Sequence, residues 1–248
     1  MGRRAILAGL LIGILAAGTV AQAAPDGASI ELRLNDGAGA PGSTALRILV
    51  LLTVLAVAPS ILLLMTCFVR FVIALHFLRQ ALGTPQMPPN QVLIGLALFM
   101  TLFVMAPVLD EVHDEAWVPY NEGAIDTVEA LQAASVPLKD FMLHHTRKAD
   151  LALFVNMAHV ETPRGPDDLP LRVVVPAFVI SELRTGFEIG FLLFLPFLVI
   201  DLVVASVLLS MGMMMLPPVM VSLPFKVLLF ILVDGWSLLA GSLVAGFR

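Results

Sequence analysis

Long apolar runs separated by short polar stretches make up most of this 248-residue chain. Four of them have the length of helices that enter or cross a membrane, namely Leu46–Val69, Val92–Leu109, Leu171–Ser210 and Pro217–Phe247. Every run contains proline, at Pro59, Pro107, Pro196 and Pro224 among others. Because proline removes a helical hydrogen bond, kinked helices around a cavity fit this pattern better than plain anchors. The pattern predicts an all-α membrane protein.

The runs pair into two predicted hydrophobic hairpins, residues 46–109 and 173–248. The first run is expected to end at Arg70, and its connection to the second run carries Arg70 and Arg79 with no acidic residue. Short, positively charged loops stay cytoplasmic, so both outer ends of this hairpin are expected on the opposite side.

Local signals predict where several helices begin and end. Pro59 is expected to interrupt the first run, and Gly83 can supply a left-handed helix stop. Asn90 stands where the cap of the second helix is expected. Ser135 is a plausible cap for a helix entered at Pro137.

The N-terminal 23 residues have the pattern of a cleaved secretory signal peptide. Two arginines precede a short apolar core, and Ala21-Gln22-Ala23 is a small-x-small cleavage site. An uncleaved first helix is the alternative, but the core is shorter than the about 20 residues that a span needs. Residues 24–45, rich in Gly, Ala, Pro and Asp, then predict a flexible tail of no assigned role.

Residues 110–172 are the one stretch with the composition of a soluble protein. The stretch opens with four acidic residues, continues with helical apolar spacing, and ends in the Pro/Gly-rich loop Glu161–Pro170. We expect a small helical extracytoplasmic insertion, too small for a large core of its own, that folds against neighbouring helices.

Composition agrees with membrane insertion and excludes other classes of protein. Hydrophobic residues make up 59% of the chain, charged residues 13%, and mean hydropathy is +0.96. The net charge of −5 and the lack of a basic cluster argue against nucleic acid as a partner. Cys67 is the only cysteine, so disulfides within the chain are excluded and a buried, inert thiol is expected.

Two aspartates lie inside the last two runs. Asp201 and Asp234 stand about equally far from the turn near Pro217, which predicts a similar depth. A charge at mid-bilayer costs about 3 kcal/mol, so each side chain should face protein or water. A structural hydrogen bond between helices is favoured over a proton pathway.

Further charges open the same runs. Arg184 and Glu188 have the i, i+4 spacing of a weak local pair. Glu182 and Lys226 lack such neighbours, and a buried charge needs a partner. We therefore expect them to pair with each other between helices or between subunits, with Arg147 from the insertion as a further candidate.

The turn between the last two runs is rich in methionine. Met211, Met213, Met214 and Met215 lie beside Gly212 and two prolines. Unbranched thioethers repack around objects of varying shape, so a ring of such loops would form a deformable apolar collar that blocks ions yet parts for a polypeptide. A packed or lipid-facing turn explains the pattern equally well.

No catalytic residue, metal site or cofactor site is predicted. His144 and His145 are adjacent, so on a helix they point about 100° apart, and no further metal ligand can be placed. Phosphate loops, HExxH and nucleophile elbows are missing from the sequence. His113, His144 and His145 are left without assigned roles, and the chain does not have the pattern of an enzyme.

Long motifs of the chain resemble the FliP family of flagellar biosynthetic membrane proteins. The stretches PAFVISELRTGFEIGF (Pro176–Phe191) and PPVMVSLPFKVLLF (Pro217–Phe230) are similar to the two signatures of that family. MTCFVRFVIALHFLRQALGTP, DFMLHHTRKADLALF, the GMMMLPP loop and LVDGWSLLAGSL are similar too, so the resemblance covers residues 46–247.

The resemblance implies a non-enzymatic pore subunit of the type III export gate. It implies a pentamer assembled with FliQ and FliR and other export proteins in the bacterial inner membrane, within the flagellar basal body. Such a gate passes unfolded flagellar subunits outward, and its helices stand largely on the periplasmic side. Met213, Met214 and Met215 match the family's methionine gasket, and Glu182 and Lys226 match its signature charges.

Two other functions stay open. A homologous gate subunit of a virulence injectisome is close to the first, although the signal peptide and the long insertion favour the flagellar version. A proton-coupled transporter using Asp201 and Asp234 belongs to a different class, and it predicts flux through the isolated protein.

Overall fold

The computed structural model describes residues 41–84, 86–158, 165, 168–213 and 215–247. The predicted signal peptide, residues 1–23, and residues 24–40 of the predicted tail lie outside the described residues. The chain divides into two units, Met1–Leu62 and Leu63–Arg248. Within the described part every regular element is a helix.

The first unit is described through helix α2 (Pro41–Leu64). The expected start at Leu46 is wrong, since the helix already begins at Pro41 within the predicted tail. Pro59 lies inside α2 and does not interrupt it. Apolar side chains are exposed on all sides from residue 46 onward, as in a helix that lipid or other chains surround.

The chain breaks at residues 65–67, not at Pro59. Thr66 Oγ1 donates to the carbonyl of Leu63 at 2.7 Å and accepts from the amide of Phe68 at 3.3 Å. A hydroxyl that bonds nearby backbone groups competes with the helical ladder. Arg70, the predicted end of the run, lies inside the next helix because the break precedes it.

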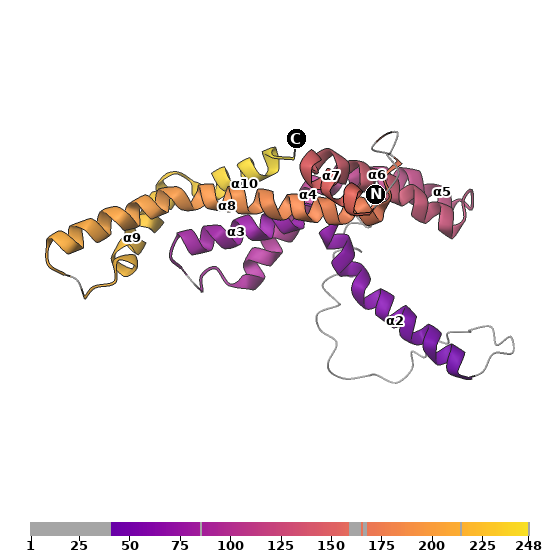
Figure 1. Cartoon of the computed structure of the whole chain (residues 1–248), viewed down its shortest axis with the longest axis horizontal. Helices are drawn as coiled ribbons and strands as arrows, with labels where there is room; N and C mark the ends of the chain where they lie inside the picture. The colour runs from indigo at the N-terminus through magenta and orange to yellow at the C-terminus, as the bar shows by residue number, and fades with distance from the viewer. Residues whose placement is uncertain (1–40, 85, 159–164, 166–167, 214, 248) are drawn as a thin grey trace. The chain divides into compact units, whose positions relative to one another are not determined.

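The second unit contains the remaining elements (Figure 1). These are α3 (Phe68–Ala81), α4 (Asn90–Val112), the π-helix η1 (His113–Trp117), α5 (Val118–Asn121), α6 (Thr127–His145), α7 (Lys148–Met157), α8 (Leu171–Ser210), α9 (Pro218–Leu232) and α10 (Gly235–Ala245). The predicted run Leu171–Ser210 is confirmed as the single 40-residue helix α8. It extends about 60 Å and packs against α3, α6, α7 and α9.

One of the predicted helix ends is confirmed and two predicted caps are wrong. Gly83 does end α3, with φ +73°. Asn90 is not a cap; it is the first residue of α4, and its Oδ1 accepts from Arg79 Nη1 at 2.6 Å. Ser135 is not a cap either, because α6 begins earlier and contains Pro137. The real cap is a capping box made by Asp126 and Glu129.

The second and fourth runs also differ from expectation. The second does not end at Leu109, since helix continues through η1 to Asn121. The fourth is not one helix: α9 and α10 meet at an angle of 64°. Asp234 lies at this break with φ +50°, and the glycine that follows leaves room for the Phe230 ring, since a Cβ on Gly235 would lie 2.2 Å from it.

Among the described residues, two helical stretches, Asn90–Asn121 and Leu171–Ser210, are long and apolar enough to cross a membrane. The number rises to four if α2 with α3 and α9 with α10 each count as one broken span. These lengths and compositions confirm the expected all-α membrane protein.

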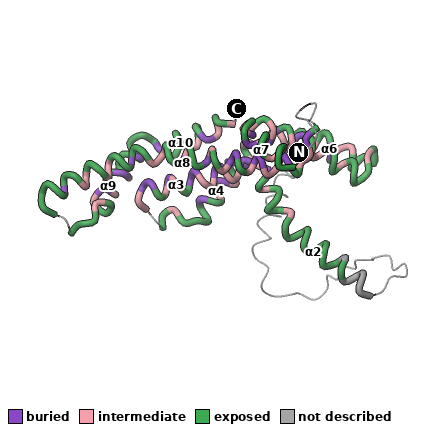
Figure 2. Tube along the Cα trace, viewed as in Figure 1, coloured by how far each residue is buried: buried purple, intermediate pink, exposed green. Residues whose placement is uncertain are grey.

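The core of the second unit lies where α3, α4 and α8 meet (Figure 2). Helix α3 buries Phe71, Leu75 and Leu78, which recur at helical spacing along one face. On α8, a Cβ at Gly186 would lie 3.2 Å from Ile73, and one at Gly190 would lie 2.5 Å from the Phe77 ring. The small-xxx-small spacing of these glycines therefore lets α3 approach α8 closely.

Replacing Gly190 with alanine should destabilise the second unit. The added methyl would lie 2.9 Å from the Cβ of Phe77 as well as against its ring, so α3 itself must shift. Overpacking of this kind costs about 1–3 kcal/mol. Thermal unfolding in detergent measures the effect.

Gly95→Ala is the matched control, because a Cβ at Gly95 meets no atom within 4 Å. Alanine there gains helix propensity of about 1 kcal/mol. Equal stability of the Gly190 and Gly95 variants would contradict the close packing of α3 and α8.

Candidate functional site

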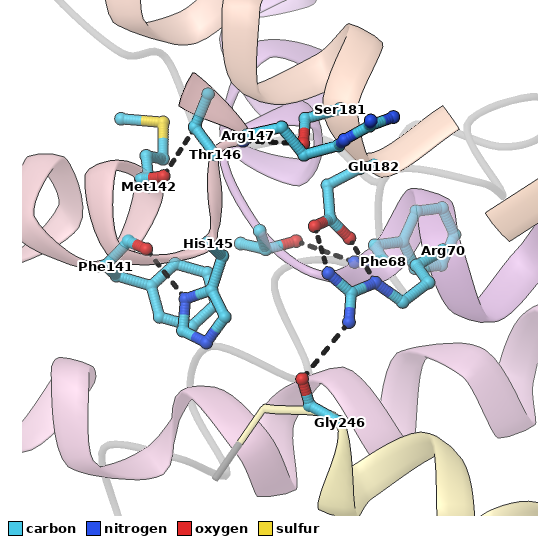
Figure 3. A network of polar contacts seen from close by, with 11 residues as sticks. Phe68, Arg70, Phe141, Met142, His145, Thr146, Arg147, Ser181, Glu182 and Gly246 are labelled. Carbon is cyan, nitrogen blue, oxygen red and sulfur yellow. Dashed lines mark hydrogen bonds and ion pairs between the residues drawn. The ribbon is translucent and has the colours of Figure 1, made fainter. Parts of the chain in front are cut away.

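A buried ion pair joins the middle of the second unit (Figure 3). Arg70 on α3 donates from Nε to Glu182 Oε2 at 2.8 Å and from Nη2 to Glu182 Oε1. Glu182, on α8, is 0% exposed, and Arg70 is 5% exposed. The two parallel hydrogen bonds form the bidentate geometry that gives arginine its specificity for carboxylates.

The C-terminal end of the described chain covers this pair. Arg70 Nη1 donates to the carbonyl of Gly246 at 3.3 Å, and the guanidinium carbon lies 3.7 Å from the centroid of the Phe247 ring. Phe247 also packs against Phe71 and Phe141, with ring centroids 5.6 and 6.1 Å away. Arg70 is thus satisfied by a carboxylate, a carbonyl and an aromatic face.

The connection between α6 and α7 docks beside the pair. The amide of Arg147 donates to Ser181 Oγ at 3.0 Å, next to Glu182 on α8. The side chain of Arg147 lies 3.8 Å from Glu188, and the predicted pair of Arg184 and Glu188 is confirmed at 3.0 Å. Exposed pairs of this kind contribute about 0–1 kcal/mol each, so the buried contacts hold the insertion.

His145, without a role in the sequence, lies at the same place. Its Nδ1 donates to the carbonyl of Phe141 at 2.8 Å, and its ring packs on Phe141 and Phe247 at 4.5 and 5.1 Å. Burial lowers the pKa of His145 below its ordinary value of 6.5. The hydrogen bond to Phe141 opposes that shift, and the nearby charges of His144 and Arg70 lower the pKa further.

A second buried charge holds three helices together farther along α8. Lys226 Nζ on α9 donates to Asp201 Oδ2 on α8 at 2.7 Å and to the carbonyl of Ala81 at the end of α3 at 3.1 Å. Ser222 Oγ donates to the other carboxylate oxygen of Asp201. An ammonium at a helix C-terminus also meets the negative end of the helix dipole.

The predicted pairing of Glu182 with Lys226 is wrong within this chain. Glu182 pairs with Arg70 and Lys226 with Asp201, and the two acidic–basic pairs lie at separate levels of α8. The similar membrane depth of Asp201 and Asp234 stays a prediction, whereas the favoured hydrogen bond between helices is confirmed for Asp201. Asp201 is paired between helices, whereas Asp234 is exposed at the break between α9 and α10.

The methionine turn joins α8 to α9 and carries no charge. Helix α8 ends at this turn in a Schellman motif. Gly212 N donates to Leu209 O at 3.1 Å, and Met213 N donates to Leu208 O at 3.0 Å. Gly212 has the φ of +73° that this motif requires. Met211, Met213 and Met215 are 67%, 38% and 97% exposed. Met214 lies outside the described residues.

Sequence reasoning missed several members of this arrangement. The pattern predicts Arg70 in the connection between two runs, although apolar residues on both sides of it indicate a buried charge that needs a partner. Ser222 and the Gly246–Phe247 end gave no signal, because their contacts join residues far apart in the chain. Cys67, predicted to be a buried thiol, is confirmed as buried and free.

The comparisons with known proteins agree with one another. A model of the FliP family matches residues 51–243. The flagellar biosynthetic protein FliP of Bacillus subtilis (strain 168) is 59% identical over 205 residues, covering 83% of this chain and 93% of that protein. The proteins of the same name from Caulobacter vibrioides and Aquifex aeolicus are 51% and 48% identical, covering 98% and 96% of this chain and 89% and 98% of their own lengths.

Removing one partner of the Arg70–Glu182 pair should be far more damaging than removing both. Arg70→Met leaves a buried, unpaired carboxylate, a change that costs about 3–5 kcal/mol. Arg70→Met with Glu182→Leu removes both charges and should recover much of that loss. Unfolding free energies of the two singles and the double measure the coupling.

Arg184→Met, which breaks an exposed pair on the same helix, is the control and should cost about 0–1 kcal/mol. Additive losses in the double variant would show that Arg70 and Glu182 do not act as a pair.

The stability of the second unit should depend on pH through His145. Because the folded state lowers the pKa of His145, the unfolded state takes up the proton first as pH falls. The contribution of His145 is therefore fully present above about pH 6.5 and is lost as pH falls through the lower folded pKa. Unfolding free energies measured from about pH 8 down to about pH 5 give the slope.

His145→Phe keeps an aromatic ring and removes the titration, so the slope should flatten. His144→Gln should leave most of the slope unchanged, because burial of the His145 ring is the main cause of its lowered pKa. An unchanged slope in His145→Phe would assign the dependence to other groups.

Proposed function

The chain belongs to the FliP family and is a membrane component of the flagellar export apparatus, and from this premise we propose that it is a pore-forming subunit of the export gate. In this proposal, copies of the chain surround an axis in the bacterial inner membrane, and unfolded flagellar subunits pass along that axis. The methionine turn seals the closed pore. The insertion, residues 110–172, stands on the periplasmic side.

The observation that carries the proposal is the character of the turn between α8 and α9. Met215 is 97% exposed at the end of two long apolar helices, although a turn that only connects helices has no need of flexible thioethers. No charged residue lies between Asp201 and Lys226, so the surface that would face the axis is apolar. An apolar constriction excludes ions because water leaves it.

The lateral surface of α8 supports assembly with other chains. Only 11% of its most apolar 18-residue window is buried within this chain, whereas Glu182, Lys226 and Arg70 are paired inside it. The charges are thus satisfied before assembly, and the exposed apolar surface is left for lipid, sister chains and the proposed partners FliQ and FliR. We propose the pentameric ring that the family resemblance implies.

The two alternatives have less support. A transporter built on Asp201 and Asp234 needs both carboxylates at one site, but Asp201 is held by Lys226 and Ser222 while Asp234 lies at a helix break. An injectisome subunit has the same physical requirements as a flagellar one. The relatives named above are flagellar proteins, which supports the flagellar assignment.

Shortening the methionine side chains should make the assembled gate leak ions. Met213→Ala with Met215→Ala removes the thioethers and widens an apolar constriction without adding charge. Small-ion conductance of the purified complex in lipid bilayers should rise several-fold, while secretion of flagellar proteins in cells persists at least in part.

Met220→Ala is the matched control, since Met220 is 70% exposed but lies on α9 beyond the turn. It should leave conductance unchanged. An ion-tight complex after Met213 and Met215 are shortened would reject the seal, and flux through the isolated monomer would reject the gate in favour of a transporter.

A further inference from the structure

Behind the methionine turn, α8 and α9 enclose an open apolar groove of about 560 Å³. From α8 it is lined by Val199, Ile200, Val203, Val204, Val207 and Leu208, and Met211 follows at the turn. From α9 it is lined by Val221 and Phe225. Every one of these side chains is aliphatic, aromatic or a thioether, so an apolar group entering the groove leaves no polar atom unsatisfied.

Polar contacts join α8 and α9 at one end of the groove. At this end, Asp201 on α8 accepts hydrogen bonds from Ser222 and Lys226 on α9. Lys226 also donates to the carbonyl of Ala81 at the end of α3. At the other end the two helices are joined only by the turn. Between Asp201 and the turn, the polar side chains of α8 are Ser206 and Ser210, and their hydroxyls donate to the carbonyls of Val203 and Ser206 on α8 itself. Neither of these bonds joins α8 to α9.

The Schellman motif places Met213 beside this groove. In that motif the residue after the left-handed glycine lies over the residue five positions before it, and the two commonly make an apolar contact. Here these residues are Met213 and Leu208, and Leu208 is a lining residue. Met213 is 38% exposed, against 97% for Met215, so its side chain is already partly covered.

We propose that the groove is the receiving site for the Met213 side chain when the gate opens. In the closed gate Met213 belongs to the seal; in the open gate its thioether turns away from the axis and packs between α8 and α9. This inference rests on the proposed function. When a polypeptide enters, thioethers that leave an apolar seal need another apolar surface to pack on. The groove would provide that surface.

The chemistry of the side chain suits the movement. Methionine has several rotatable bonds and no polar hydrogen, so it can move from seal to groove by rotamer changes alone. Because both places are apolar, the free-energy difference between them is small, and a passing polypeptide can shift the balance. Gly212 lets the chain turn sharply at the neighbouring position without a Cβ in the way.

Filling the groove should block opening without breaking the seal. Val204→Phe adds an aromatic ring at a half-buried lining position, while Leu202→Phe adds the same ring at an exposed position of α8 that does not line the groove. We expect Val204→Phe to assemble and stay ion-tight but to secrete many-fold less, and Leu202→Phe to secrete normally. Normal secretion by Val204→Phe would overturn the proposal.

A reversible lock tests the same point in one assembled complex. Met213→Cys with Val207→Cys places two thiols at the turn and at the groove, and the native Cys67 is 0% exposed and does not compete. Oxidation should join them and raise ion conductance above that of Met213→Cys alone, and reduction should return the conductance to that level. A pair that never joins, or that joins without a leak, would overturn the proposal.

The failure of this inference differs from the failure of the gate itself. If Met213→Ala with Met215→Ala leaks but the oxidised cysteine pair stays tight, the seal is real and the groove does not receive Met213. If the alanine variant does not leak, the gate proposal fails first.

Discussion

The pairing of Arg70 with Glu182 is the constraint on which the rest of the second unit depends. Taking a guanidinium and a carboxylate out of water costs several kcal/mol per ion, and only good geometry and further hydrogen bonds offset that cost. Here the bidentate contact, the Gly246 carbonyl and the Phe247 ring supply them. Because these groups come from α3, α8 and the C-terminal end, satisfying one arginine fixes three distant segments together.

A second buried ion pair, between Lys226 on α9 and Asp201 on α8, joins helices in the same way farther along α8. Between the two levels, Gly186 and Gly190 let α3 lie close against α8. No charged residue lies between Asp201 and Lys226, and this part of α8 and α9 lines an apolar groove. The chain therefore combines a region held by buried ion pairs with an uncharged end that carries exposed methionines.

Several features follow directly from the sequence. Apolar runs of about 20 residues or more identify membrane helices because lipid leaves no other way to satisfy the backbone, and α8 has the limits that its run predicts. Gly83 ends its helix as its conformational freedom suggests. The resemblance carried by long motifs agrees with the family found by comparison, and those motifs contain Arg70, Glu182 and Lys226 of the two buried ion pairs.

The sequence by itself determined the class of protein, the main helices and the positions where charge must be neutralised, since each of these depends on local composition. It could not choose the partners, because the apolar runs contain several acidic and basic residues and the sequence does not show which of them meet. The structure pairs Arg70 with Glu182 and Lys226 with Asp201. The sequence also misplaced helix starts and breaks where Thr66, Asp126 and Gly235 act through local bonds and packing. Only the tertiary structure decided these, because the energy of a buried charge depends on which distant groups surround it.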